Sequence, residues 1–208
     1  DVDSKSISDG IYGGMARAIG IHVYDDSSDY QVTNAGLIDA NASGTSAYAA
    51  GIRQYSSAYG ANTSIENSGT INATAVGTTD AFAGGMVFSS TVNGGAQAIN
   101  SGTITAVASV TDAIISFGKG GRRGGALAAG MISEYPIFSG SFINSESGVI
   151  NATASANATG FAKAVGMAVV DNVYDAGVIE NKGVINVTAT GEGESVMAIG
   201  MEIGQLGA

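Results

Sequence analysis

Apolar and polar residues alternate strictly along several stretches of this chain, and the segment from residue 65 to residue 75 shows it most clearly. Ile65, Asn67, Gly69, Ile71 and Ala73 share one parity, while Ser, Thr, Glu and Asn side chains take the positions between them. A period of two is the pattern of a β-strand. Residues that favour helices are scarce, and the 32 glycines interrupt every stretch. The pattern therefore predicts strands rather than helices.

The same alternation returns along the chain at a nearly constant spacing. Its consensus is I-x-N-x-G-x-I-x-A-x-A, followed by a short loop, A-x-A-x-G-[IM] and a variable segment. The glycine after the asparagine falls at positions 36, 69, 102, 148 and 183, and the glycine before Ile or Met falls at 20, 51, 85, 130, 166 and 200. The chain is thus a repeat of about 33–35 residues with a degenerate first unit and one insertion.

Strands that recur in the same order, without long helices between them, predict a coil of parallel strands. Each repeat then forms one rung, stacked about 4.8 Å above the previous one. The predicted fold is all-β: a right-handed parallel β-helix (β-solenoid) of about six rungs, with about 33–35 residues per rung and one inserted loop. Residues 1–208 form a single domain, with rungs at approximately 7–30, 31–62, 63–95, 96–140, 141–175 and 176–208 and an insertion at about 116–127.

Stacking places equivalent residues of successive rungs above one another, and we call each such set a ladder. The isoleucine ladder comprises Ile38, Ile71, Ile104, Ile150 and Ile185, and the alanine pairs make a thin edge where two sheets approach closely. The asparagine ladder comprises Asn34, Asn67, Asn100, Asn144 and Asn181. Asparagine side chains bond to one another between rungs, or satisfy backbone groups at a bend. We expect a structural role for these asparagines, because a catalytic residue would not recur in every rung.

Charge and composition exclude several classes of function. The chain has 8 Lys and Arg against 18 Asp and Glu, a net charge of −10. Binding to duplex nucleic acid needs a basic stripe, so no nucleic-acid partner is expected. No apolar run approaches the ~20 residues of a transmembrane helix, so no transmembrane segment is expected. The absence of cysteine excludes disulfides and thiolate metal sites.

The segments NSGTINATAVG, NKGVINVTATG and AFAGGM resemble the repeats in β-helical passenger regions of bacterial autotransporters and related large surface adhesins. The resemblance covers nearly the whole chain, from about Ile7 to Ile203, and is compositional and periodic rather than a catalytic signature. It implies a protein that is extracellular, at the cell surface, and used for adhesion or surface architecture.

Two acidic turns are the candidate metal site. The pattern D-[DN]-x-x-D occurs twice at the same distance after a glycine, and its acidic members are Asp25, Asp26, Asp29, Asp171 and Asp175. Hard oxygen ligands on a turn suit Ca²⁺. Solvated turn carboxylates would give the same pattern, so both interpretations stay open. No other cofactor is expected.

Two groups of residues are candidates for contact with a partner. Lys119, Arg122 and Arg123 lie in the glycine-rich insertion, which would either grip an acidic neighbour or an anionic glycan, or form an ordinary exposed loop. The second group is an apolar stripe on the outward parity of the A-x-A-x-G strand, interrupted by Arg17 and Lys163. Its members are Tyr48, Phe82, Leu127 and Met197. Apolar stripes on a face that should be wet usually mark interfaces.

The favoured function is that of a non-enzymatic extracellular structural protein. Such a solenoid would stack copies of itself head to tail into a filament, or serve as cell-surface or adhesin architecture, because open strand edges at its ends invite pairing. No catalytic residue is assigned: His22 is the single histidine, and no G-x-S-x-G elbow surrounds a serine. The alternative is a carbohydrate-binding or carbohydrate-cleaving β-helix, with Asp80 and Asp112 as its acidic pair and glycans or a host surface as partners.

The predicted parity can be tested with two aspartate substitutions at neighbouring positions. Ile71→Asp should destabilise the chain severely, because it buries a charge without a partner. Thr70→Asp, on the outward parity, should have a mild effect. Thermal unfolding of the two variants measures the difference, and equal melting shifts would show that the parity is wrong.

Overall fold

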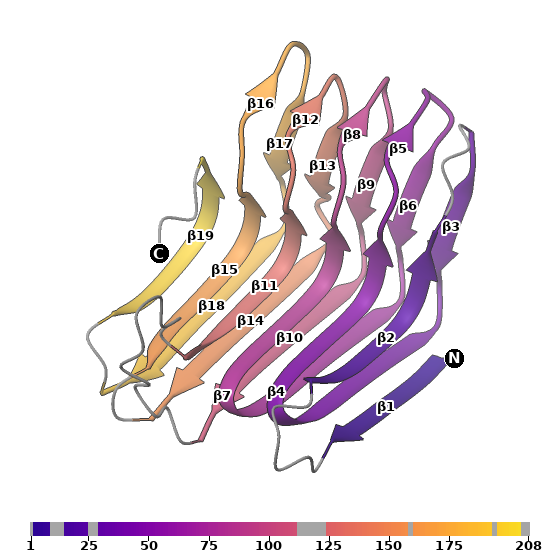
Figure 1. The fold of residues 1–208 in the computed structure, drawn as a ribbon. Helices are drawn as coiled ribbons and strands as arrows, with labels where there is room; N and C mark the ends of the chain where they lie inside the picture. The colour runs from indigo at the N-terminus through magenta and orange to yellow at the C-terminus, as the bar shows by residue number, and fades with distance from the viewer. Residues whose placement is uncertain are drawn as a thin grey trace.

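The protein is a coil of parallel strands in the computed structural model, and the chain climbs through it one rung at a time (Figure 1). The structure describes residues 2–8, 15–24, 29–111, 124–157, 160–192 and 195–204, the first of these ranges as backbone only. Within these ranges every regular element is a strand, and successive rungs pair in parallel. The described N-terminal and C-terminal strands lie at opposite ends of the stack (Figure 1).

Two long faces make up most of each rung. The first long face contains β1 (Val2–Ser8), residues 37–44 of β4 (Leu37–Gln54), residues 70–77 of β7 (Thr70–Phe88), β10 (Thr103–Val110), β14 (Val149–Ala156) and β18 (Val184–Gly191). The second long face contains β2 (Met15–Val23), the remainder of β4 and β7, β11 (Gly125–Ser133), β15 (Phe161–Val169) and β19 (Val196–Ile203). In β4 and β7 one strand folds over from the first face to the second.

Two narrower sheets close the coil on the side away from that fold. The short sheet contains two-residue strands: β5 (Ala58–Tyr59), β8 (Val92–Asn93), β12 (Ile137–Phe138) and β16 (Val173–Tyr174). The corner sheet contains β3 (Gln31–Asn34), β6 (Ser64–Asn67), β9 (Gln97–Asn100), β13 (Ser141–Asn144) and β17 (Val178–Asn181).

The predicted all-β solenoid with parallel stacked strands is confirmed, but its length differs from the prediction. The structure has about five turns, where the sequence predicted about six rungs. The reason is the degenerate first unit, which supplies β1 and β2 to the long faces. The corner sheet begins only with β3 of the next turn. The predicted insertion lies largely outside the described residues, and its last three residues, 125–127, belong to β11.

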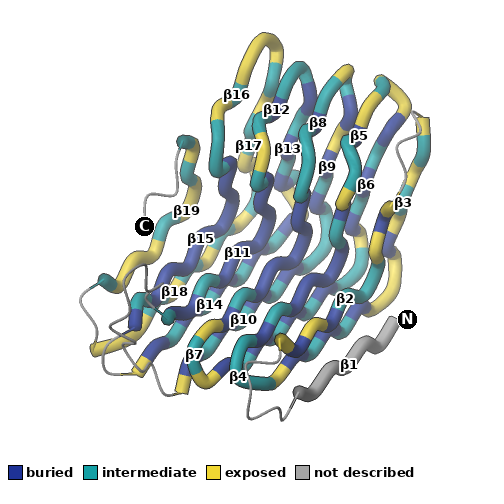
Figure 2. The backbone as a smooth tube through the Cα atoms, viewed as in Figure 1, coloured by how far each residue is buried: buried dark blue, intermediate teal, exposed yellow. Residues whose placement is uncertain are grey.

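Residues of the predicted inward parity form two separate cores. Alanines fill the thin edge where the two long faces meet, and bulkier Ile, Met, Phe and Val side chains fill the wide part of the rung. The isoleucine ladder lies in the wide core in the predicted register, with Ile38 opposite Ile71 and Ile71 opposite Ile104. Figure 2 shows this burial as continuous dark bands that run from rung to rung. The small alanine side chain is what lets the two faces converge, since bulkier residues hold packed sheets ~10 Å apart.

Each isoleucine of this ladder packs against a glycine of the opposite long face. A Cβ built on Gly85 would lie 2.1 Å from Cγ2 of Ile104, and one built on Gly51 would lie 2.1 Å from Cγ2 of Ile71. Gly20, Gly130 and Gly166 meet the ladder in the same way. The recurring glycine before Ile or Met is therefore a socket for a branched side chain. Gly200, in the last rung, has nothing within 4 Å of such a Cβ.

None of the described residues belongs to a helix long and apolar enough to cross a membrane.

The contacts between these glycines and the isoleucine ladder can be tested with a matched pair of glycine substitutions. Gly85→Ala should lower the free energy of unfolding by about 1–3 kcal/mol, the usual cost of overpacking a filled site. In the single, unstacked chain, Gly200→Ala should leave it unchanged or raise it by up to about 1 kcal/mol, because the added methyl meets nothing and alanine restricts the unfolded chain. Chemical denaturation of both variants measures this, and a Gly200→Ala loss as large as that of Gly85→Ala would contradict the assignment.

Candidate functional site

The predicted asparagine ladder is present, and its side chains form a continuous chain of hydrogen bonds along the corner sheet. The Nδ2 atom of Asn34 donates to Oδ1 of Asn67 over 2.7 Å, and Asn67 donates to Asn100 over 2.8 Å. Asn100 donates to Asn144 over 2.8 Å, and Asn144 to Asn181 over 2.7 Å. Every bond points from the N-terminal to the C-terminal rung, so the ladder has a direction. Because these amides are paired and the inner ones are buried, the ladder acts as a structural element.

Most of these asparagines are followed two residues later by a glycine. Glycine is needed at this position because neighbouring rungs approach each other closely there. A Cβ on Gly69 would lie 2.1 Å from the carbonyl oxygen of Gly36, and one on Gly102 would lie 2.1 Å from that of Gly69. A side chain at this position would therefore collide with the rung below. The same glycine carbonyls accept weak second bonds from the ladder, for example Asn67 Nδ2 to Gly69 O at 3.4 Å.

The predicted apolar stripe forms a ladder on the outer surface of the second long face. The register places its members in one line, in the order Arg17, Tyr48, Phe82, Leu127, Lys163 and Met197. The rings of Tyr48 and Phe82 stack with centroids 4.9 Å apart. The guanidinium groups of Arg17 and Arg53 lie 5.4 Å and 5.1 Å from the Tyr48 centroid, within cation–π range. The stripe is therefore bounded by cations at its N-terminal end.

The alternation of the second long face changes at one point, and the outward residues there form a buried floor beneath the stripe. Gly85 faces the wide core together with Met86, so the parity shifts between Phe82 and Val87 and both point outward. The floor, which we call the outer cluster, consists of Ala50, Val87, Ala129, Ile132, Val165 and Ala168. Tyr48 and Phe82 pack against it. The stripe is thus more self-packed than the alternating pattern predicted.

The environment of Tyr48 keeps its phenol neutral. Burial raises the pKa of Tyr48 above its usual range, the charge of Glu134 raises it further, and Arg17 opposes the shift. Its hydroxyl oxygen has no hydrogen-bond partner among the described residues. At the other end of the same surface, Lys163 Nζ lies 2.9 Å from a carboxylate oxygen of Glu202, and its side chain is only 8% exposed. The lysine is therefore neutralised within the face.

The acidic turns predicted as a Ca²⁺ site are split between the two ends of the corner sheet. Asp29 precedes β3 and Asp175 precedes β17, and these strands are the two outermost of that sheet. Both residues have a positive φ, 67° and 55°, as have Gly60, Gly94 and Ser139 in the turns of the rungs between. Aspartate tolerates this conformation better than most residues, which explains the recurrence.

Other predicted ligands and contacts are only partly visible. Asp171 accepts hydrogen bonds from the backbone and side-chain nitrogens of Asn172 at 2.9 and 3.1 Å. Asp25, Asp26, Lys119, Arg122, Arg123 and Asp112 lie outside the described residues. Within the described ranges no group of three or more His, Cys, Asp or Glu side chains converges as a metal site would require. Calcium binding remains a prediction.

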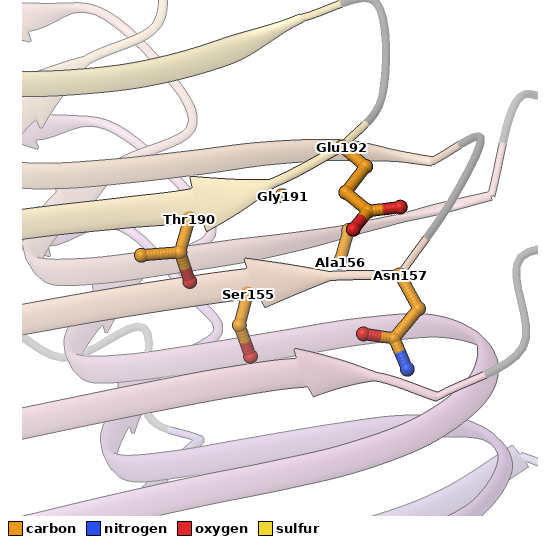
Figure 3. Close-up of a pocket in the computed structure, with 6 residues that line it drawn as sticks. All are labelled: Ser155, Ala156, Asn157, Thr190, Gly191 and Glu192. Atoms are coloured by element: carbon orange, nitrogen blue, oxygen red, sulfur yellow. The ribbon is translucent and has the colours of Figure 1, made fainter.

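One open hollow of about 440 Å³ lies at the thin edge of the two C-terminal turns. Its lining is Ser155, Ala156, Asn157, Thr190, Gly191 and Glu192. Figure 3 shows Ser155 and Thr190 on neighbouring strands, with Asn157 and Glu192 just beyond the strand ends. The lining supplies one carboxylate, whereas hydrolysis of a glycosidic bond usually employs two. Asp80, from the predicted acidic pair, accepts bonds from Thr79 and Ser46 in the bend of β7 instead of lining this hollow.

Sequence reasoning missed the glycine sockets and an aromatic group near the N-terminal rung. Tyr24 and Tyr55 stack at 5.2 Å, and His22 meets each ring edge-on at about 6 Å. The spacing of His22, Tyr24 and Tyr55 relative to the repeat was the available signal. Comparison with protein-family models, with curated proteins and with solved structures finds no match to this chain. The structure thus establishes a β-solenoid repeat protein.

The ladder predicts a position-dependent effect of removing one asparagine. Asn100→Ala should cost roughly 2–5 kcal/mol, because the buried amides of Asn67 and Asn144 each lose a short hydrogen bond that water does not replace. Asn181→Ala, at the exposed end, should cost less than about 1 kcal/mol, because water replaces the lost group. Urea unfolding of both variants provides the comparison, and similar midpoints would show that the ladder bonds contribute little.

Proposed function

We propose that this chain is a non-enzymatic structural solenoid of the cell surface that assembles by stacking its C-terminal rung on the N-terminal rung of another copy. The observation that carries the proposal is the state of the last rung. Core positions that are buried in the rung before it, such as those of Met167 and Val169, are open in the last described rung. Solenoids that stay monomeric usually end in a polar capping repeat.

The exposure of the last rung is large for core positions. Met201 is 40% exposed and Ile203 is 60% exposed, whereas their partners in the previous rung, Met167 and Val169, are each 1% exposed. Val196, whose partner Ala162 is buried in the previous rung, is also exposed. The contrast is visible along β19 and β15 in Figure 2. Each unit of apolar area that a stacked rung covers is worth about 25 cal/mol per Å², so this end favours association.

The N-terminal rung presents matching residues in the same ladders. The register of the inner rungs, continued by one step, brings Ile21 over Met201, Val23 over Ile203 and Ala18 over Ala198. The strand that follows Gly200 in the stack is then β1, which has Val2 at the register position of the isoleucine ladder. The interface therefore repeats the packing that holds the inner rungs together.

Polar groups at the two ends are also compatible with stacking. Glu202 and His22 occupy the same outward ladder, so the junction sets an imidazole opposite a carboxylate. The corner sheets do not meet, because β3 begins one turn later than β1 and β2. The step between Asn181 and Asn34 is then two strand spacings, about 9.6 Å, and water fills it. The junction is therefore formed mainly by the two long faces.

The cell-surface part of the proposal is supported by the resemblance of the repeats to autotransporter passengers. The low charged fraction of the chain, 12%, agrees with a protein that presents extended sheet faces rather than a charged surface. Adhesion to a glycan or a host surface would use those same faces. The alternative, a carbohydrate-cleaving enzyme, is not favoured by any described cluster of carboxylates.

Light scattering coupled to size-exclusion chromatography tests the assembly. The wild-type chain should show a mass that rises with protein concentration above 20.5 kDa. Ile203→Asp should return it to the monomer, because the charge lies on the stacking surface. The control is Tyr135→Asp, which replaces a residue of similar exposure away from both ends and should assemble as the wild type does.

Two outcomes would overturn self-assembly. One is a wild-type monomer of 20.5 kDa at every concentration, and the other is an Ile203→Asp variant that assembles normally. The open rung would then be a surface that further repeats of a longer passenger cover.

A further inference from the structure

The outer surface of the first long face is a nearly uncharged array of small polar and β-branched side chains. Five strands, β4, β7, β10, β14 and β18, each contribute four outward positions, twenty in all. These positions hold seven Thr, four Asn, four Val, three Ser, one Leu and one Asp. Asp39 is the single charged residue among them, although the chain carries 26 charged residues. The described charges lie mainly in turns, corners and the second long face.

The array is regular in two directions. The register from residue 37 of β4 to β18 contains no shift on this face, so equivalent side chains follow one another at the strand spacing of about 4.8 Å. Along each strand, outward side chains are about 6.6 Å apart. Threonine and valine have stiff χ1 angles, and Asn186 donates to Asn151 over 2.9 Å, which holds neighbouring ranks together. Little side-chain entropy remains to be lost when a ligand binds.

The chemistry of this face argues against most partners. The twenty positions hold no aromatic ring on which a sugar could stack and no cation for nucleic acid or anionic lipid, and Lys5 of β1 stands in register with Asn41 at the edge of the array. A dry interface with another protein would bury fourteen Thr, Asn and Ser side chains without matched partners, which costs free energy for each. A partner made of ordered water avoids this cost, because water both donates to and accepts from every hydroxyl and amide.

The spacing of the array fits such a partner. In a tetrahedral lattice with O–H···O distances of 2.7–2.8 Å, second-neighbour oxygens lie about 4.5 Å apart, within about 0.3 Å of the rung spacing. We propose that the first long face binds the surface of an ice crystal, with hydroxyls and amides bonded to lattice waters and the methyl groups of Thr and Val between them. This binding is independent of end-to-end stacking.

The test is the gap between the melting and freezing temperatures of an ice crystal held in a solution of the purified chain. The wild type should open this gap and shape the crystal into facets. Thr105→Lys should lose most of it, because a long flexible cation stands at the centre of the array, on the middle strand β10. The matched control is Thr111→Lys, which makes the same exchange just beyond the end of β10 and should behave as the wild type does.

The fold and the assembly state of the wild type and of each variant are measured in the same samples. Circular dichroism and melting temperature should be equal for the two lysine variants, which separates loss of binding from loss of structure. The Ile203→Asp monomer should still shape ice, so that failure of stacking and failure of ice binding are distinguishable. Absence of a gap for the wild type, or equal activity of Thr105→Lys, would overturn the proposal. A change of mass in Thr105→Lys without any effect on ice would show instead that this face joins copies of the chain.

Discussion

Parallel stacking in strict register is the constraint on which the rest of this structure depends. Backbone hydrogen bonds hold each rung about 4.8 Å above the last. Every side chain therefore lies at this distance from the side chain at the same position of the next rung, and the two must be compatible. Apolar ladders satisfy this by contact, as the isoleucines do. Asparagine satisfies it by a donor and an acceptor on one side chain, which allows the same residue to bond above and below. A ladder of like charges would repel, and in the described rungs charges gather at turns and corners instead.

The same constraint explains why glycine recurs at two places in the rung. In the socket it makes room for the branched side chain of Ile104 or its equivalents, and after the asparagine it makes room for a carbonyl of the rung below. Neither case rests on an unusual φ, since the positive φ values of the described residues fall in the turns before the corner sheet and at Gly204. Glycine is therefore selected here by close approach. Each of these two glycines recurs in the sequence because its packing contact occurs once in each turn.

A stack of this kind has two unlike ends and two unlike long faces. The ends differ because the chain and the asparagine bonds run in one direction, which leaves core residues such as Met201 open at the C-terminal end. The faces differ because the bend at Gly85 turns outward residues of the second face onto one another and buries the outer cluster. From residue 37 of β4 to β18 the first face has no register shift, and its threonines, valines and asparagines stay in line from rung to rung. The stacking and the ice binding that we propose would therefore use separate parts of the structure.

The sequence alone was sufficient to predict the strand class, the parallel stacking, and the membership of the isoleucine and asparagine ladders, because each of these depends on period and spacing. It predicted the rung count less well, since the described strands of the degenerate first unit, β1 and β2, belong to the long faces alone. Tertiary structure decided the rest. The two acidic turns share one pattern in the sequence, but Asp29 and Asp175 precede the two outermost strands of the corner sheet, because their repeats stack at opposite ends of it. Likewise, Phe82 and Val87 have opposite parities along the strand and meet only because the bend between them shifts the alternation.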